Sequence, residues 1–189
     1  MTINANIPTL TADRFVLRGF REDDAPALAK LHGDAEVMRY LSGEPEPSLA
    51  KAWDYMALHT GHWLFKGYGK WALADAKTDE LLGRVGYFDA PYEWPGLELG
   101  WTISRNLWGK GYASEAAILA LDWGFANIDT NEIISLIYPE NERSIRVAER
   151  LGEKFVRPWT NKSGNELRIY AITRDEWHAR KSGQIRPRP

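Results

Sequence analysis

The stretch "ELGWTISRNLWGKGYASEA", residues 98–116, decides the fold, because it places a strand, a glycine-rich turn and a helix in immediate succession. Gly109 and Gly111 flank Lys110, and apolar residues take up helical spacing from about Tyr112. Glycine allows backbone conformations that a Cβ forbids, and a helix begins with unpaired N–H groups and a partial positive charge. The turn is therefore either a tight strand–helix connection or a cradle for an anion, best suited to phosphate.

The flanking sequence predicts further strands and helices by its hydrophobic spacing and turn residues. The expected strands are residues 14–20, 70–76, 81–90, 96–104, 132–140, 154–158 and 166–172. The expected helices are residues 21–41, 49–69, 114–128 and 141–151, the last with Asn141 as N-cap and Gly152 just past its end. This order predicts an α/β (α+β) three-layer domain with a mixed sheet.

Composition excludes several classes of function. The 189 residues carry a formal net charge of −2, which does not suggest a nucleic-acid binder held by bulk charge. No cysteine is present, so disulfides, thiolate metal sites and a cysteine nucleophile are excluded. No apolar run reaches membrane-spanning length and the N-terminus lacks a signal-peptide layout, so we expect a cytoplasmic protein without a membrane partner. We expect one domain over residues 13–178, after an extension of 1–12 and before a basic, frayed tail of 179–189.

Two motifs carry a resemblance to a known family: residues 98–116 and "NERSIRVAERLGEKF", residues 141–155. They resemble the GNAT N-acetyltransferase superfamily, and within it the ribosomal-protein (RimJ/RimL-type) branch. The resemblance extends over residues 14–173 and implies a mostly antiparallel sheet of about seven strands flanked by helices. It also implies that acetyl-CoA is the cosubstrate and that no metal is needed.

In this family a loop of pattern Arg/Gln-x-x-Gly-x-Gly/Ala binds the pyrophosphate of acetyl-CoA, and residues 108–113 match it. Trp108 departs from the first position, so the resemblance implies that phosphate contacts rest on backbone amides and Lys110. A splayed strand is expected to offer backbone groups to the pantetheine arm. The cofactor-binding residues implied in this way are Trp101, Ile103, Trp108, Gly109, Lys110, Gly111, Tyr112, Ala113, Ser114 and Asn141.

The resemblance also assigns the chemistry. Glu98 lies where family members carry a glutamate that deprotonates the acceptor amine, although a strand carboxylate also has a simple solubilising role. The usual tyrosine acid is replaced by Ala148, and Ser144 is the nearest group for the CoA sulfur. Ser144 is equally an ordinary first-turn serine. Asn141 either contacts pantetheine or only caps its helix.

The expected reaction is direct acetyl transfer in a ternary complex to a primary amine, either a protein N-terminus or a small molecule. The alternative is a non-catalytic acyl-CoA-binding module. We expect the acceptor to contact residues 40–69 and 157–166. Four aromatic residues are possible pocket walls, although simple packing is the favoured role of each: Tyr40, Trp63, Tyr87 and Trp159. A homodimer is possible, but no interface signal is visible.

Overall fold

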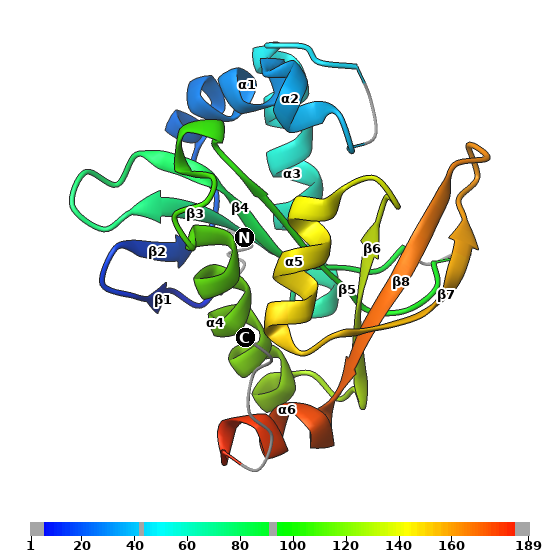
Figure 1. Ribbon diagram of the computed structural model, residues 1–189. Coiled ribbons are helices and arrows are strands. Elements are labelled where there is room, and N and C mark those ends of the chain that lie inside the picture. Colours follow the sequence, from blue (N-terminus) through cyan, green and yellow to red (C-terminus); the bar gives the residue numbers. More distant parts are fainter. Residues whose placement is uncertain (1–5, 42–43, 91–93, 184–189) are drawn as a thin grey trace.

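One eight-stranded sheet runs through the computed structural model, which describes residues 6–41, 44–90 and 94–183 (Figure 1). Its strands are β1 (Leu10–Thr11), β2 (Phe15–Arg18), β3 (Lys70–Asp75), β4 (Leu81–Phe88), β5 (Glu98–Ile103), β6 (Glu132–Ile137), β7 (Lys154–Thr160) and β8 (Glu166–Thr173). The α-helices are α1 (Ala25–Gly33), α2 (Ala35–Met38), α3 (Leu49–Lys66), α4 (Tyr112–Asn127), α5 (Glu142–Leu151) and α6 (Arg174–Lys181), with short 3-10 turns at Glu22–Asp24 and Arg105–Leu107.

The strand order is β1-β2-β3-β4-β5-β6-β8-β7, and every neighbouring pair is antiparallel except β5 and β6. This confirms the predicted mixed, mostly antiparallel sheet flanked by helices. The strand count is eight rather than about seven, because Leu10–Thr11 pair with Val16 and Leu17 of β2. Residues 10 and 11 of the expected N-terminal extension therefore belong to the sheet, while residues 1–5 lie outside the described ranges.

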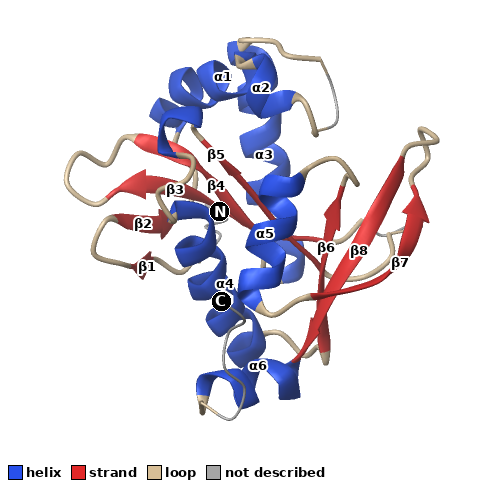
Figure 2. Ribbon diagram, in the orientation of Figure 1, coloured by secondary structure: helices blue, strands red, loops and turns tan. Residues whose placement is uncertain are grey.

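Helices cover both faces of the sheet (Figure 2). On one face α4 packs over the central strands, and its Ala117, Leu121 and Phe125 join Leu99 of β5 in the main core. On the other face α1 and α3 form a second core. Because successive strand residues point to opposite faces, Leu99 and Ile103 face α4, while Glu98, Gly100 and Thr102 face α1 and α3. The predicted alternation of β5 thus separates an apolar face from a polar one.

Two helices differ from the sequence-based expectation. The predicted helix over 21–41 is interrupted at Asp34, whose carboxylate accepts hydrogen bonds from Glu36 N and Val37 N and so begins α2. Helix α6 was not predicted; it starts with a capping box between Thr173 and Glu176. It extends into the expected tail as far as Lys181, and residues 184–189 of that tail lie outside the described ranges. No helix in the described ranges is both long and apolar enough to cross a membrane.

Candidate functional site

The site begins where β5 and β6 separate. These parallel strands share a single registered pair, Glu98 with Ile134, and Ile134 N donates to Leu97 O at 2.9 Å. One step further, the bridge between the strands is a side chain: Ser135 Oγ lies 3.0 Å from Leu99 O. Beyond this point a cavity of about 380 Å³ opens between the two strands. This volume lies within the range of small-molecule sites.

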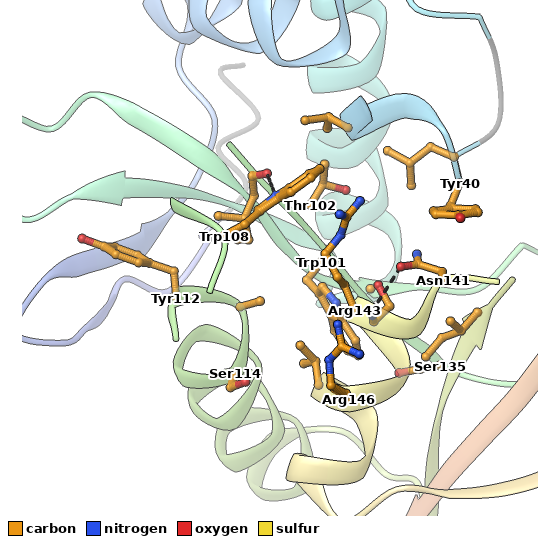
Figure 3. A pocket seen from close by; sticks show the side chains of 18 of the residues that line it. Tyr40, Trp101, Thr102, Trp108, Tyr112, Ser114, Ser135, Asn141, Arg143 and Arg146 are labelled. Carbon is orange, nitrogen blue, oxygen red and sulfur yellow. Dashed lines mark hydrogen bonds between the residues drawn. The ribbon is translucent and has the colours of Figure 1, made fainter. Parts of the chain in front are cut away.

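Every predicted site residue except Lys110 lines this cavity. The lining set comprises Glu98, Trp101, Ile103, Trp108, Gly109, Gly111, Tyr112, Ala113, Ser114, Asn141 and Ser144. They come from β5, the turn after it, the start of α4 and the start of α5 (Figure 3). Lys110 is exposed, and its carbonyl accepts a hydrogen bond from Arg14 Nη2 at 3.0 Å. The contact of Lys110 with phosphate stays a prediction.

The glycine turn has the backbone that glycine permits. Gly109 has φ +74° and Gly111 has φ +86°, both in the left-handed region. A Cβ at Gly109 would meet no atom within 4 Å, so this position opens onto free space. Gly111 is the N-cap of the sixteen-residue helix α4 and has no side chain that could accept hydrogen bonds from the first N–H groups of the helix. These N–H groups belong to residues that line the cavity. An anion is the complementary occupant.

Three arginines of α5, which the sequence analysis did not assign, add positive charge. Arg143, Arg146 and Arg150 recur at i, i+3 and i+7, which places them on one helical face, and all three line the cavity. The Arg143 guanidinium stacks 3.9 Å from the Trp108 ring centroid, and Arg150 Nη1 donates to Ser114 Oγ at 3.0 Å. Trp108 in turn donates from Nε1 to Ile103 O at 2.8 Å. The cavity mouth can therefore bind a polyanion such as a diphosphate.

The start of α5 brings Asn141 and Ser144 together. Asn141 Oδ1 accepts a hydrogen bond from Ser144 N at 3.2 Å, so Asn141 is the helix cap, as predicted. Both residues also line the cavity, so capping and ligand contact are compatible. Ala148, which replaces the family's tyrosine, is fully buried beside Ile137 and Tyr170. Ser144 is thus the hydroxyl of α5 that reaches the cavity.

Glu98 shares the cavity with two cations that were not predicted, Lys70 of β3 and Arg84 of β4. A Cβ at Gly100 would lie 3.2 Å from Glu98 Oε1 and 3.3 Å from Lys70 Nζ, so the missing side chain leaves room for both groups. Burial raises the pKa of the Glu98 carboxyl, and the charges of Lys70 and Arg84 oppose that rise. Burial lowers the pKa of the Lys70 ammonium to about 8, helped by Arg84 and opposed by Glu98.

The four aromatic residues expected as pocket walls have different places. Tyr40 lines the cavity. Trp63 and Tyr87 lie in the main core, where the Tyr87 hydroxyl donates to Ala120 O at 2.7 Å. Trp159 packs against Trp94 with ring centroids 5.7 Å apart. Packing, which the sequence favours over a wall role for these residues, is therefore confirmed for Trp63 and Tyr87.

No cluster of three or more potential metal ligands occurs within the described ranges. His62, at i+3 from His59, instead pairs its ring nitrogens with Tyr68 O and Asp89 Oδ1. His59 is buried against Tyr55, and burial lowers its pKa to about 2. Both histidines pack against aromatic rings, His59 on Tyr55 and Phe88 and His62 on Tyr68 and Phe88.

Comparison with known proteins identifies the class. Residues 14–154 match the family model described as acetyltransferase (GNAT) domain, which spans the strands, glycine turn and α5 that build the cavity. The chain therefore belongs to the GNAT acetyltransferase family and is an acyltransferase. Acetyltransferases of this family use acetyl-CoA, which fits the glycine turn and arginine face at the cavity mouth.

Individual relatives are similar in sequence over most of this chain. The chain is 36% identical to YkkB of Bacillus subtilis over 79% of this chain and 89% of that protein. It is 30% identical to the N-acetyltransferase p20 of Bacillus licheniformis, over 87% and 94%. It is 26% identical to the spermidine N(1)-acetyltransferase of Escherichia coli, over 72% and 70%.

Solved structures share the fold. An acetyltransferase from Agrobacterium tumefaciens superposes with a TM-score of 0.77 at 28% identity, covering 91% of this chain and 98% of that one. The spermidine N-acetyltransferase of Vibrio cholerae, solved with CoA and spermine, gives 0.71 at 20% identity, covering 88% and 99%. The ribosomal-protein-S5-alanine acetyltransferase of Vibrio fischeri gives 0.69 at 16% identity, covering 90% and 98%. These two structural relatives are named for different acceptors, spermidine and a ribosomal protein.

Proposed function

We propose that this protein is an acetyl-CoA-dependent N-acetyltransferase that transfers the acetyl group directly to a primary amine. The observation that carries the proposal is the cavity between β5 and β6, which joins an anion-binding mouth to the Glu98 carboxyl. The mouth suits the diphosphate of the cosubstrate. The gap between the strands suits its extended arm, with Ser144 and Asn141 on one wall.

Glu98 and Ser144 have separate roles at the proposed reaction centre. Glu98 takes a proton from the attacking amine, and its burial makes it a stronger base than an exposed carboxylate. The C–N bond forms as the C–S bond breaks, the amine proton goes to Glu98, and the Ser144 hydroxyl donates a hydrogen bond to the CoA thiolate that leaves. Cysteine is absent from the chain, which agrees with direct transfer rather than a cysteine-bound intermediate.

The acceptor class sets how much Glu98 matters. With a pKa near 7.8, roughly one α-amino group in ten is neutral at pH 7, whereas an alkylamine near 10.4 is neutral about once in a few thousand molecules. A protein N-terminus, as in the RimJ/RimL-type branch, therefore needs the base far less than a polyamine does. The structural relatives include one named for a ribosomal protein and one named for spermidine.

The test is calorimetric titration of acetyl-CoA into matched glycine variants. Gly109 and Gly164 both have positive φ and open space around an added Cβ, but only Gly109 lines the cavity. A valine at either position strains the backbone by about 1–2 kcal/mol. We expect Gly109→Val to weaken acetyl-CoA binding at least tenfold while Gly164→Val leaves it unchanged. Equal affinity of folded Gly109→Val and wild type contradicts the cradle.

The proposal also requires turnover. Wild-type protein is expected to release free CoA from acetyl-CoA in the presence of a primary amine, which a thiol reagent detects. Tight acetyl-CoA binding without CoA release on any amine would instead support the non-catalytic acyl-CoA-binding module.

A further inference from the structure

Near Glu98, the buried and half-buried side chains that line the cavity carry more positive than negative charge. Arg84 is only 7% exposed and lines the cavity, yet its Nε has no hydrogen-bond partner in the described chain. Within the same ranges neither Arg84 nor Lys70 forms an ion pair with a carboxylate. Two carboxylates line the cavity: Glu98 is half-buried and Glu36 is exposed. The Arg84 guanidinium stacks 4.5 Å from the centroid of the Tyr55 ring, which supplies no net negative charge. A buried guanidinium without a carboxylate partner is costly unless an anion completes it.

The strand register shows how these groups are spaced. Arg84 lies opposite Thr102, one pair from one end of the paired β4–β5 segment, and Phe88 lies opposite Glu98 at the other end. Between them Gly86 lies opposite Gly100, and Lys70 of β3 lies opposite Gly86. The middle row therefore has no side chain from β4 or β5. This row of glycines leaves space between the Glu98 row and the Arg84 row. Lys70 Nζ lies close to Gly100, 3.3 Å from the position of an added Cβ.

A second unsatisfied group lies beside Arg84. Thr102 is 6% exposed, lines the cavity, and its Oγ1 has no hydrogen-bond partner among the described residues. A threonine hydroxyl and a guanidinium on adjacent strands can donate to the same anion. Both groups face the side of the sheet covered by α1 and α3, opposite to α4. The α4 turn that suits the diphosphate belongs to the opposite face of the sheet, which leaves the acceptor as the candidate ligand for Arg84 and Thr102.

We propose that Arg84 and Lys70, assisted by Thr102, bind a carboxylate of the acceptor, so that the substrate is a small amine with a carboxylate close to its amino group. The inference rests on the proposed acetyl transfer to an amine at Glu98. Arginine pairs with carboxylate in a planar, bidentate geometry, which gives orientation as well as affinity. The same two cations repel the ammonium groups of a polyamine, and a peptide amide cannot replace the carboxylate.

The experiment compares matched acceptors on the full chain with acetyl-CoA. The pairs are leucine with isoamylamine, phenylalanine with phenethylamine, and histidine with histamine, which differ by the carboxylate alone. Leucinamide represents a protein N-terminus, and because its amino group is neutral more often, a preference for leucine cannot come from amine ionisation. Spermidine represents polyamines. O-phosphoethanolamine with ethanolamine tests whether phosphate is favoured instead. Binding of each amine to the enzyme–CoA complex is measured in parallel by calorimetry.

We expect kcat/KM for at least one amino acid to exceed that of its carboxylate-free partner, leucinamide and spermidine by roughly tenfold or more. Arg84→Met and Lys70→Met should each remove most of that preference, while Arg84→Lys retains part of it. Arg168→Met is the matched control, because Arg168 stacks on Phe155 of β7 outside the cavity. If Arg84→Met does not fold, the wild-type preference and Lys70→Met decide.

Several results would overturn the inference. The carboxylate site is refuted if the carboxylate-free partners bind and turn over equally well or better, if only phosphate is favoured, or if no amino acid binds. It is also refuted if the preference for the carboxylate survives both Met substitutions. Acetylation of spermidine without acetylation of amino acids would refute the carboxylate site and leave the proposed N-acetyltransferase intact. Absence of acetyl-CoA binding would refute the proposed function itself.

Discussion

At the scale of single residues, the proposed mechanism depends on Glu98 as the base. Burial raises the pKa of this carboxyl, so the deprotonated form, and with it kcat/KM, is lost as the pH falls through that raised value. We expect Glu98→Gln to lower kcat/KM for an alkylamine by about 10²-fold or more and to remove this acid limb. An amino acid amide, whose amino group is neutral more often, should lose less.

Glu36→Gln is the control for this prediction, because Glu36 lines the cavity but is exposed. Equal activity of Glu98→Gln on an alkylamine would remove Glu98 from the mechanism.

Ser144 permits a second test at this scale. Its backbone N–H, not its hydroxyl, makes the hydrogen bond to the capping Asn141 side chain, so Ser144→Ala preserves the start of α5. We expect this variant to lower kcat roughly tenfold or more while acetyl-CoA affinity changes little. Steady-state kinetics with calorimetry separate the two effects. A loss of affinity with unchanged kcat would instead assign Ser144 to cosubstrate binding.

At the scale of elements, α6 is the helix that the sequence analysis missed. Trp177 of α6 is 3% exposed, packs into the main core and donates from Nε1 to Asp122 Oδ1 at 2.9 Å. We expect Trp177→Ala to lower the free energy of unfolding by about 3–5 kcal/mol, as for a buried aromatic side chain. Trp53→Ala is a matched control, because Trp53 is 55% exposed on α3. Urea denaturation of both variants measures the difference, and equal small losses would mean that α6 contributes little.

Local chemistry explains which elements the sequence predicts. Asn141 as cap and Gly152 with φ +94° fix both ends of α5, because each signal acts within a few residues. The spacing Thr173-x-x-Glu176 is the same kind of signal and could have located α6. The interruption at Asp34 is also local, since the aspartate side chain competes for the backbone N–H groups that follow it.

The cavity was only partly predictable, for a different reason. The glycine turn and Glu98 lie in one continuous motif, so a single stretch of sequence indicates them. Arg84 and Lys70 lie on other strands and reach the cavity only through the register of β3, β4 and β5. An arginine within a strand pattern gives no sign that it is buried. Such residues are visible only once strand pairing is known.

At the scale of the whole molecule, a buried carboxyl links α5 to the point where the strands separate. Glu153, directly after the Gly152 cap, is 3% exposed, and its Oε1 lies 3.0 Å from Ser135 Oγ. Ser135 Oγ also lies 3.0 Å from Leu99 O. A hydroxyl has one hydrogen, so it donates to only one of these oxygens. If Glu153 is protonated it donates to Ser135, and the serine hydrogen then bridges β6 to β5.

This arrangement makes the free energy of unfolding depend on pH. Burial raises the pKa of Glu153 from 4.5 to about 8, opposed by the hydrogen bond with Ser135. Below about 4.5 both folded and unfolded chains hold the proton; between 4.5 and about 8 only the folded chain does, so its stability falls as the pH rises. Glu153→Gln should therefore gain stability relative to wild type over that interval, by at most about 5 kcal/mol, and no further above it. Urea titrations from pH 4 to 9 measure the difference, with the exposed Glu166→Gln as control. Parallel curves for Glu153→Gln and wild type would show that Glu153 is ionised in the folded chain.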